Sequence, residues 1–174
     1  MINLKSLSRL QMTSKIYSDL LTLAGKSGCM KMKVGAIILH RGEVIAQGYN
    51  EVGYGLSCRK VMEIQYSRRS CLPPSSPAFE EWLKTDAARD FHREWSKNTE
   101  VHAEANALVC ISRFEPYIDE YEMYCLYSPC TACVKDIIAH GIRKFYYFYD
   151  YKCQEGIMMM EKAGIQVQKL VAAN

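Results

Sequence analysis

The spacing of apolar positions divides the first 50 residues into a helix followed by a hairpin. Thr13–Gly25 carries apolar side chains at helical intervals and ends on a glycine, a residue that commonly stops helices. Lys33–His40 and Glu43–Asn50 are two apolar runs separated by the dipeptide Arg41-Gly42. Two strand-like runs joined by a short turn predict an antiparallel hairpin.

The second half of the chain alternates between strand-like and helix-like patterns. Strands are expected at Glu122–Tyr127, Ile142–Asp150 and Ile165–Leu170. Helices are expected at His102–Ile111, Thr131–His140 and Glu155–Ala163. The resulting order of elements predicts an α/β layered domain in which helices cover a mixed sheet.

A long segment with weaker patterning separates the hairpin from these elements. Glu51–Lys60 indicates a loop, and the three prolines of Cys71–Pro77 exclude regular structure there. Phe79–Trp95 predicts a helix that is polar on most sides and therefore lies on the surface. We expect residues 1–174 to form one domain, with an insertion at about 51–97 of the kind that often carries function.

Composition and charge narrow the class of protein. The 174 residues are enough for one domain, and 24% of them are charged, which is typical of globular proteins. The formal charge is only +3, and no long basic run is present. Proteins that hold a polynucleotide backbone usually carry a stronger positive footprint. The mild positive charge fits a small anionic substrate equally well, so charge alone decides little, although no nucleic-acid partner is expected.

Eight cysteines are many for this length and raise the question of disulfides. The apolar residues of Met1–Leu10 are interrupted by polar ones, so no secretory segment is indicated. No apolar run is long enough to cross a bilayer. We therefore expect a reduced cytoplasmic protein without a membrane partner, whose thiols are metal ligands or small buried side chains.

Two short motifs carry candidate chemistry. They are His102-Ala103-Glu104 and Cys130-x-x-Cys133, the second preceded by a proline and located at the start of a predicted helix. One imidazole and two thiolates can hold zinc and leave its fourth position open for water, as catalytic zinc sites do. Glu104 lies near that metal and can move protons during the reaction. This order of residues is the known signature of zinc nucleobase deaminases.

Each motif alone has simpler interpretations. A single C-x-x-C also fits a structural zinc or a redox pair, and most H-x-E triplets lie on ordinary helix surfaces. Their combination, with each motif followed by a predicted helix, favours a catalytic zinc site.

Four segments resemble the deoxycytidylate deaminases, in particular those of T-even-type bacteriophages. They are KVGAII (Lys33–Ile38), GYN (Gly48–Asn50), HREWSKNTEVHAEANAL (His92–Leu108) and YSPCTAC (Tyr127–Cys133). The resemblance extends from about residue 29 to residue 167. It implies a cytidine deaminase-like three-layer α/β/α sandwich with a central mixed five-stranded sheet. It also implies conversion of dCMP to dUMP and ammonia, which supplies dUMP for thymidylate synthesis.

The resemblance assigns roles to individual residues of the site. His102, Cys130 and Cys133 would bind the catalytic zinc, and Glu104 would transfer protons. The backbone of Ala103 would bind the base carbonyl.

Three further residues are candidates for substrate contacts. The resemblance implies that Asn50 contacts the sugar hydroxyl, although asparagine is also a common turn former. Asn106 lies one helical turn after His102 and could face the same cleft or be satisfied in the core. Tyr127 could stack on the pyrimidine or be a structural aromatic.

The phage-type relatives also carry a second zinc. The matching positions here are Cys29, His92 and Glu100, with Cys58 as the expected fourth ligand and Cys71 as the alternative. A closed set of this kind would hold the insertion to the core without offering an open metal position.

The resemblance further implies a hexamer that dCTP activates and dTTP inhibits, and it allows magnesium to accompany a nucleotide effector. A phage enzyme would act in the host cytoplasm. Arg113 matches an arginine near the subunit contact and effector region, although a surface charge is an equal alternative. Glu51–Gly53 departs from the family pattern after GYN, which places the inherited effector control in doubt.

Two competing functions share parts of this pattern. A deaminase that acts on a base in tRNA or single-stranded nucleic acid uses the same zinc motif, but it should bind oligonucleotides with a steep dependence on salt. A catalytically silent, zinc-stabilised binding module would have no need of Glu104. Residues that bind the substrate phosphate are not assigned, and the segment Tyr149–Lys152 is only a candidate.

Overall fold

The computed structural model describes residues 7–53, 57–111, 121–152 and 154–172, which form two compact units. The first unit contains the described residues of 1–27, 34–50 and 102–174. The second contains those of 28–33 and 51–101, and so includes most of the predicted insertion.

The first unit is built on a mixed five-stranded sheet in the order β2-β1-β5-β6-β7. β1 pairs antiparallel with both β2 and β5, whereas β5, β6 and β7 run parallel. The strands are β1 (Gly35–His40), β2 (Glu43–Tyr49), β5 (Tyr121–Tyr127), β6 (Lys144–Tyr149) and β7 (Gln166–Lys169). The predicted hairpin and the predicted mixed sheet are therefore confirmed.

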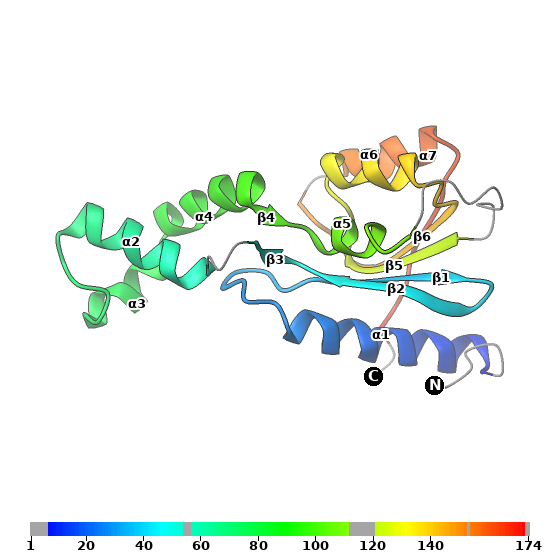
Figure 1. Cartoon of the computed structure of the whole chain (residues 1–174), viewed down its shortest axis with the longest axis horizontal. Helices are drawn as coiled ribbons and strands as arrows, with labels where there is room; N and C mark the ends of the chain where they lie inside the picture. Colours follow the sequence, from blue (N-terminus) through cyan, green and yellow to red (C-terminus); the bar gives the residue numbers. More distant parts are fainter. Residues whose placement is uncertain (1–6, 54–56, 112–120, 153, 173–174) are drawn as a thin grey trace. The chain divides into compact units, whose positions relative to one another are not determined.

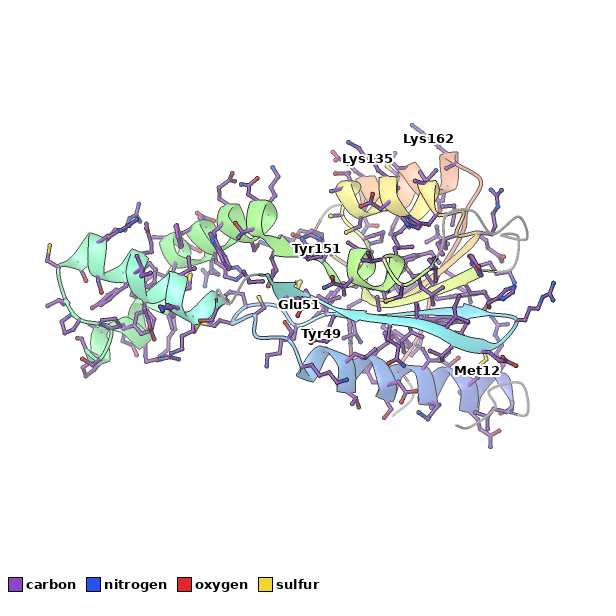
Figure 2. The ribbon with its side chains drawn as sticks, in the orientation of Figure 1. Met12, Tyr49, Glu51, Lys135, Tyr151 and Lys162 are labelled. Atoms are coloured by element: carbon purple, nitrogen blue, oxygen red, sulfur yellow. The ribbon has the colours of Figure 1, made fainter. Side chains whose placement is uncertain are left out.

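Helices cover both faces of this sheet, which gives three layers (Figure 1). α1 (Arg9–Gly25) lies on one face, and α5 (Ala103–Leu108), α6 (Thr131–Ala139) and α7 (Glu155–Lys162) lie on the other. Side chains that alternate along the strands fill the space on each side (Figure 2). In β1, for example, Ile37 and Leu39 pack with α1, whereas Ala36 and Ile38 pack in the opposite core.

α1 begins earlier than its apolar pattern indicated. Ser8 caps the helix by accepting from the backbone N–H of Gln11, and the Gln11 side chain accepts from the backbone N–H of Ser8. This reciprocal capping box stabilises the first turn, which adds Arg9–Met12 to the predicted helix. Ile16, Leu20, Leu23 and Ala24 form its buried stripe.

The second unit is helical, with one short two-stranded sheet. It comprises α2 (Cys58–Ser70), α3 (Pro77–Leu83) and α4 (Asp86–Thr99), together with β3 (Glu51–Val52) paired antiparallel to β4 (Glu100–Val101). Its own core consists of seven buried residues: Cys29, Cys58, Met62, Tyr66, Phe79, Leu83 and Ala88.

The second unit corrects two sequence expectations. The predicted loop Glu51–Lys60 already contains the start of α2, because the Ser57 hydroxyl accepts from the Lys60 N–H and caps the helix. The predicted helix Phe79–Trp95 is two helices, since the Thr85 hydroxyl caps a new helix by accepting from the Ala88 N–H.

Most residues of this region are exposed, as expected, but one stripe packs into the core of its own unit. Phe79 is fully buried, and Leu83, Ala88 and His92 are buried as well. A mostly polar helix can bury a narrow apolar stripe, which the average polarity of the segment hides. Among the described residues, no helix has both the length and the apolarity to cross a membrane.

Gly35, at the start of β1, lets α1 approach the sheet closely. A methyl group on Gly35 would lie 2.5 Å from the carbonyl oxygen of Leu20, a backbone atom that cannot rotate away. A larger residue would therefore push the helix from the sheet.

We predict that Gly35→Ala lowers the free energy of unfolding by about 1–3 kcal/mol, the usual cost of overpacking. Gly25→Ala is the matched control, because a methyl group there meets nothing within 4 Å. Urea denaturation of both variants checks the prediction. Equal stability of Gly35→Ala and wild type would contradict the close approach of α1.

Candidate functional site

The starts of two helices in the first unit carry the residues of both sequence motifs. His102 is the N-cap of α5 and Cys130 is the N-cap of α6, and both have extended backbone conformations. Neither side chain makes a capping hydrogen bond to its own helix. The usual N-cap interaction is replaced here by contacts between the two segments.

These contacts bring the side chains of His102, Cys130 and Cys133 together, and we call this group the three-ligand cluster. His102 Nδ1 lies 3.2 Å from Cys133 Sγ and 3.5 Å from Cys130 Sγ. The two sulfur atoms are 3.6 Å apart. Tetrahedral zinc, with bonds of about 2.0–2.3 Å, places its ligand atoms about 3.3–3.8 Å apart, and the three separations here lie within about 0.1 Å of that range. The three side chains therefore fit a zinc ion and could supply three of its four ligands.

The two cysteines of this cluster titrate as a pair. Their shared hydrogen bond lowers the pKa of Cys130 to about 3, and it raises the pKa of Cys133 together with burial. Contact with His102 also favours the Cys130 thiolate. A thiolate is the form of cysteine that binds metal, so one ligand of the cluster is prepared for it.

Glu104 follows His102 by two residues and lies in the first turn of α5. Only 5% of its surface is exposed, and burial raises the pKa of its carboxyl group. Glu104 does not belong to the group of candidate metal ligands. It is therefore a buried carboxyl group beside the three-ligand cluster, and its role in proton transfer stays a prediction.

The Ser128–Cys130 turn is supported by residues that sequence analysis missed. The Ser128 N–H donates to the Tyr149 carbonyl at 2.9 Å, and the Ser128 hydroxyl accepts from the Tyr151 N–H at 2.7 Å. A methyl group on Gly156 would lie 2.2 Å from the Pro129 carbonyl oxygen, so α7 also packs directly on this turn. These tertiary contacts could not be predicted from a local sequence pattern. Their one sequence signal was Gly156, a glycine in the first turn of a predicted helix.

Asn50 lies at the end of β2, and 4% of its surface is exposed. Its side-chain carbonyl accepts from the Val34 N–H at 2.8 Å, and its own N–H donates to the Val34 carbonyl at 3.2 Å. Asn106 donates its side-chain N–H to the Tyr49 carbonyl at 2.8 Å.

The other predicted substrate residues lie at the ends of their elements. Ala103 is buried at the first position of α5, where a backbone N–H has no partner within its own helix. Tyr127 ends β5, and its ring lies 5.5 Å from that of Tyr149. The Tyr149 hydroxyl is 2.5 Å from the Tyr17 hydroxyl. Arg113 lies outside the described residues.

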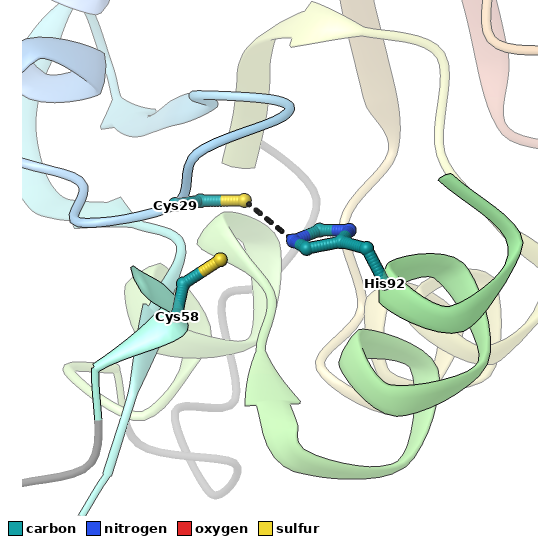
Figure 3. A group of neighbouring side chains, drawn as sticks. All are labelled: Cys29, Cys58 and His92. Atoms are coloured by element: carbon teal, nitrogen blue, oxygen red, sulfur yellow. Dashed lines mark hydrogen bonds between the residues drawn. The ribbon is translucent and has the colours of Figure 1, made fainter. Parts of the chain in front are cut away.

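A second group of metal-ligand side chains lies in the second unit, and we call it the second cluster. Cys29, Cys58 and His92 are all buried, and their ligand atoms lie within 4.8 Å of one another (Figure 3). Cys29 Sγ is 3.4 Å from His92 Nε2. The hydrogen bond between the two cysteines raises the pKa of Cys29 and lowers that of Cys58.

The two remaining candidates for this cluster differ in position. Glu100 does not belong to the group of three, but its charge is close enough to oppose the lowering of the Cys58 pKa that the hydrogen bond with Cys29 causes. Cys71, the alternative ligand, is exposed at the end of α2 and lies outside the group. Cys58 therefore lies in the second cluster, as expected of its fourth ligand, whereas Cys71 does not.

Comparison with known proteins identifies a matching family and several relatives. The family model described as the cytidine and deoxycytidylate deaminase zinc-binding region matches residues 11–149. The deoxycytidylate deaminase of Enterobacteria phage T4 is 32% identical over 158 residues, which cover 82% of this chain and 81% of that protein. The ComE operon protein 2 of Bacillus subtilis is 31% identical over 150 residues, or 85% of this chain and 65% of that protein.

A solved structure is also similar. The crystal structure of the dCMP deaminase of cyanophage S-TIM5, in complex with dCMP and dUMP, matches with a TM-score of 0.65 and 25% identity. The match covers 94% of this chain and all of that chain.

Proposed function

Because the chain belongs to the cytidine and deoxycytidylate deaminase zinc-binding family, we propose that it hydrolyses dCMP to dUMP and ammonia. The observation that carries the proposal is the three-ligand cluster, with its buried carboxyl neighbour Glu104. The names of the phage relatives and the dCMP and dUMP of the cyanophage complex support this choice of substrate. The product would supply dUMP for thymidylate synthesis.

In this proposal His102, Cys130 and Cys133 hold the catalytic zinc. The distances within the cluster suit a tetrahedral ion, and a three-residue ligand set is typical of catalytic rather than structural zinc. Zinc bound in this way supplies Lewis-acid activation of water at neutral pH.

Glu104 is the proposed proton-transfer group. It takes a proton from the attacking water and delivers it to the ring nitrogen of cytosine, and it then assists the protonation of the amine that leaves as ammonia. The water oxygen remains on the ring as the new carbonyl of dUMP. Burial of Glu104 keeps bulk water from competing for these protons.

The substrate lies between the two helix starts and the end of β2 in this proposal. The backbone N–H of Ala103 donates to the base carbonyl, and Tyr127 stacks on the pyrimidine ring. Asn50 contacts the sugar hydroxyl, with its side chain oriented by the bond from the Val34 N–H. Tyr149–Lys152 is a candidate for the phosphate contact, because its hydrogen bonds to Ser128 hold it beside the metal ligands.

We also propose a second, structural zinc in the second cluster, with Glu100 as its fourth ligand. Two buried cysteines and a buried histidine supply three ligands, and a carboxylate would close the coordination sphere. A closed site stabilises the fold of its unit without exposing the ion to substrate.

Several family properties rest on the resemblance alone and stay predictions. They are hexameric assembly, activation by dCTP, inhibition by dTTP, magnesium bound with an effector, action in the host cytoplasm, and the regulatory role of Arg113.

The proposed reaction is tested by measuring ammonia release from dCMP, cytidine, dCTP and a cytosine-containing oligonucleotide, each with and without added dCTP or dTTP. We expect dCMP to be the preferred substrate. We expect Glu104→Gln to keep its zinc and to lower kcat/KM for dCMP by at least about 10³-fold, because proton transfer is lost.

Glu161→Gln is the matched control, since this glutamate near the end of α7 is exposed and belongs to neither cluster. Activity confined to the oligonucleotide would replace the substrate assignment with a nucleic-acid base. Undiminished turnover by Glu104→Gln would exclude the proposed mechanism.

The metal content tests both clusters at once. Elemental analysis should find two zinc ions per chain in wild type and one in Cys29→Ser, which should keep the catalytic ion. Cys110→Ser serves as the control, because this exposed cysteine belongs to neither cluster. One zinc ion in fully active wild type would refute the structural site.

A further inference from the structure

The end of β2 and helix α5 are in backbone contact. A methyl group on Gly48 would lie 2.3 Å from the Ala103 carbonyl oxygen, 2.4 Å from the Ala107 nitrogen and 3.0 Å from the Asn106 carbonyl carbon. Only glycine can occupy such a position without moving the helix. The strand end and the helix are therefore packed as closely as two backbones allow.

Asn106 adds a hydrogen bond at the same contact. Its side-chain N–H donates to the Tyr49 carbonyl at 2.8 Å, across 57 positions of sequence. Tyr49 (labelled in Figure 2) immediately precedes Asn50, which pairs through two hydrogen bonds with Val34. The bonds form a continuous path from α5 through the end of β2 to the residue that precedes β1.

This path connects residues with different proposed tasks. α5 carries Ala103 and Glu104, which act on the base, and the end of β2 carries Asn50, which acts on the sugar. The distance between the residues that contact the base and the residue that contacts the sugar must match the substrate closely. Hydrogen bonds weaken steeply when their distances or angles depart from the optimum.

We infer that Asn106 is a positioning residue that sets Asn50 against the sugar hydroxyl rather than contacting the substrate itself. The inference rests on the proposed function and deepens it, because it assigns recognition of the 3′-hydroxyl to Asn50 and Asn106 acting together. The donation to the Tyr49 carbonyl gives Asn106 a structural partner beside Asn50.

The test compares kcat/KM for dCMP and for 2′,3′-dideoxycytidine 5′-monophosphate, which lacks the 3′-hydroxyl. Wild type should prefer dCMP. Asn106→Leu, which is similar in size but donates no hydrogen bond, should reduce this preference by about tenfold, with a smaller loss on the dideoxy substrate.

A double-mutant cycle separates positioning from direct contact. Asn50→Ala should abolish the preference, and adding Asn106→Leu to it should leave the ratio unchanged, because both residues act on the same hydroxyl through Asn50. A preference for dCMP that survives Asn50→Ala and falls only when Asn106→Leu is added would mean that Asn106 contacts the sugar independently, and it would overturn the inference. An equal loss on both substrates in the single variant would also overturn it, since it would indicate a general structural role.

Control experiments distinguish a failure of this inference from a failure of the proposed function. Asn98→Ala removes a side-chain N–H that donates to the Glu94 carbonyl at 2.9 Å on α4, and it should leave the ratio at the wild-type value. Zinc content should be unchanged in Asn106→Leu, and zinc loss would count against the inference. If that variant does not fold, Asn106→Asp provides the same comparison. Wild type without dCMP turnover would instead refute the proposed function.

Discussion

Three candidate ligand atoms from two distant chain segments must meet within 3.2–3.6 Å of one another, and the rest of the first unit is arranged to achieve this. His102 precedes α5, and Cys130 and Cys133 are at the start of α6. The parallel pairing of β5 and β6 requires a crossover, and α6 provides it. The ligand-bearing turn therefore lies at the carboxyl end of β5, where ligand sites commonly form in open α/β sheets.

Close backbone packing holds the segments around the three-ligand cluster in place. Gly48 and Gly156 each allow a backbone to approach another backbone more closely than any side chain would permit. The first brings β2 against the helix of His102 and Glu104, and the second brings α7 against the turn before Cys130. The positions of the candidate metal ligands are thus supported by β2 and α7, which carry none of these ligands.

The sequence was sufficient for the order of elements in the first unit and for the grouping of three candidate metal ligands. Apolar runs with β-branched and aromatic residues predicted the strands, and the two motifs contain the three candidate ligands that the structure brings together. It was insufficient in the second unit, where α2 and the break at Thr85 depend on capping hydroxyls within a polar region. Contacts such as the hydrogen bond from Asn106 to the Tyr49 carbonyl also could not be predicted from the sequence, because they depend on how distant segments pack.

The catalytic metal site is tested most directly by a crystal structure of the wild-type protein with anomalous data collected at the zinc absorption edge. We expect a zinc ion bonded at about 2.0–2.3 Å to His102 Nδ1, Cys130 Sγ and Cys133 Sγ, with its fourth position taken by solvent or substrate. Absence of metal at these atoms, or a fourth protein side chain on the ion, would contradict this expectation.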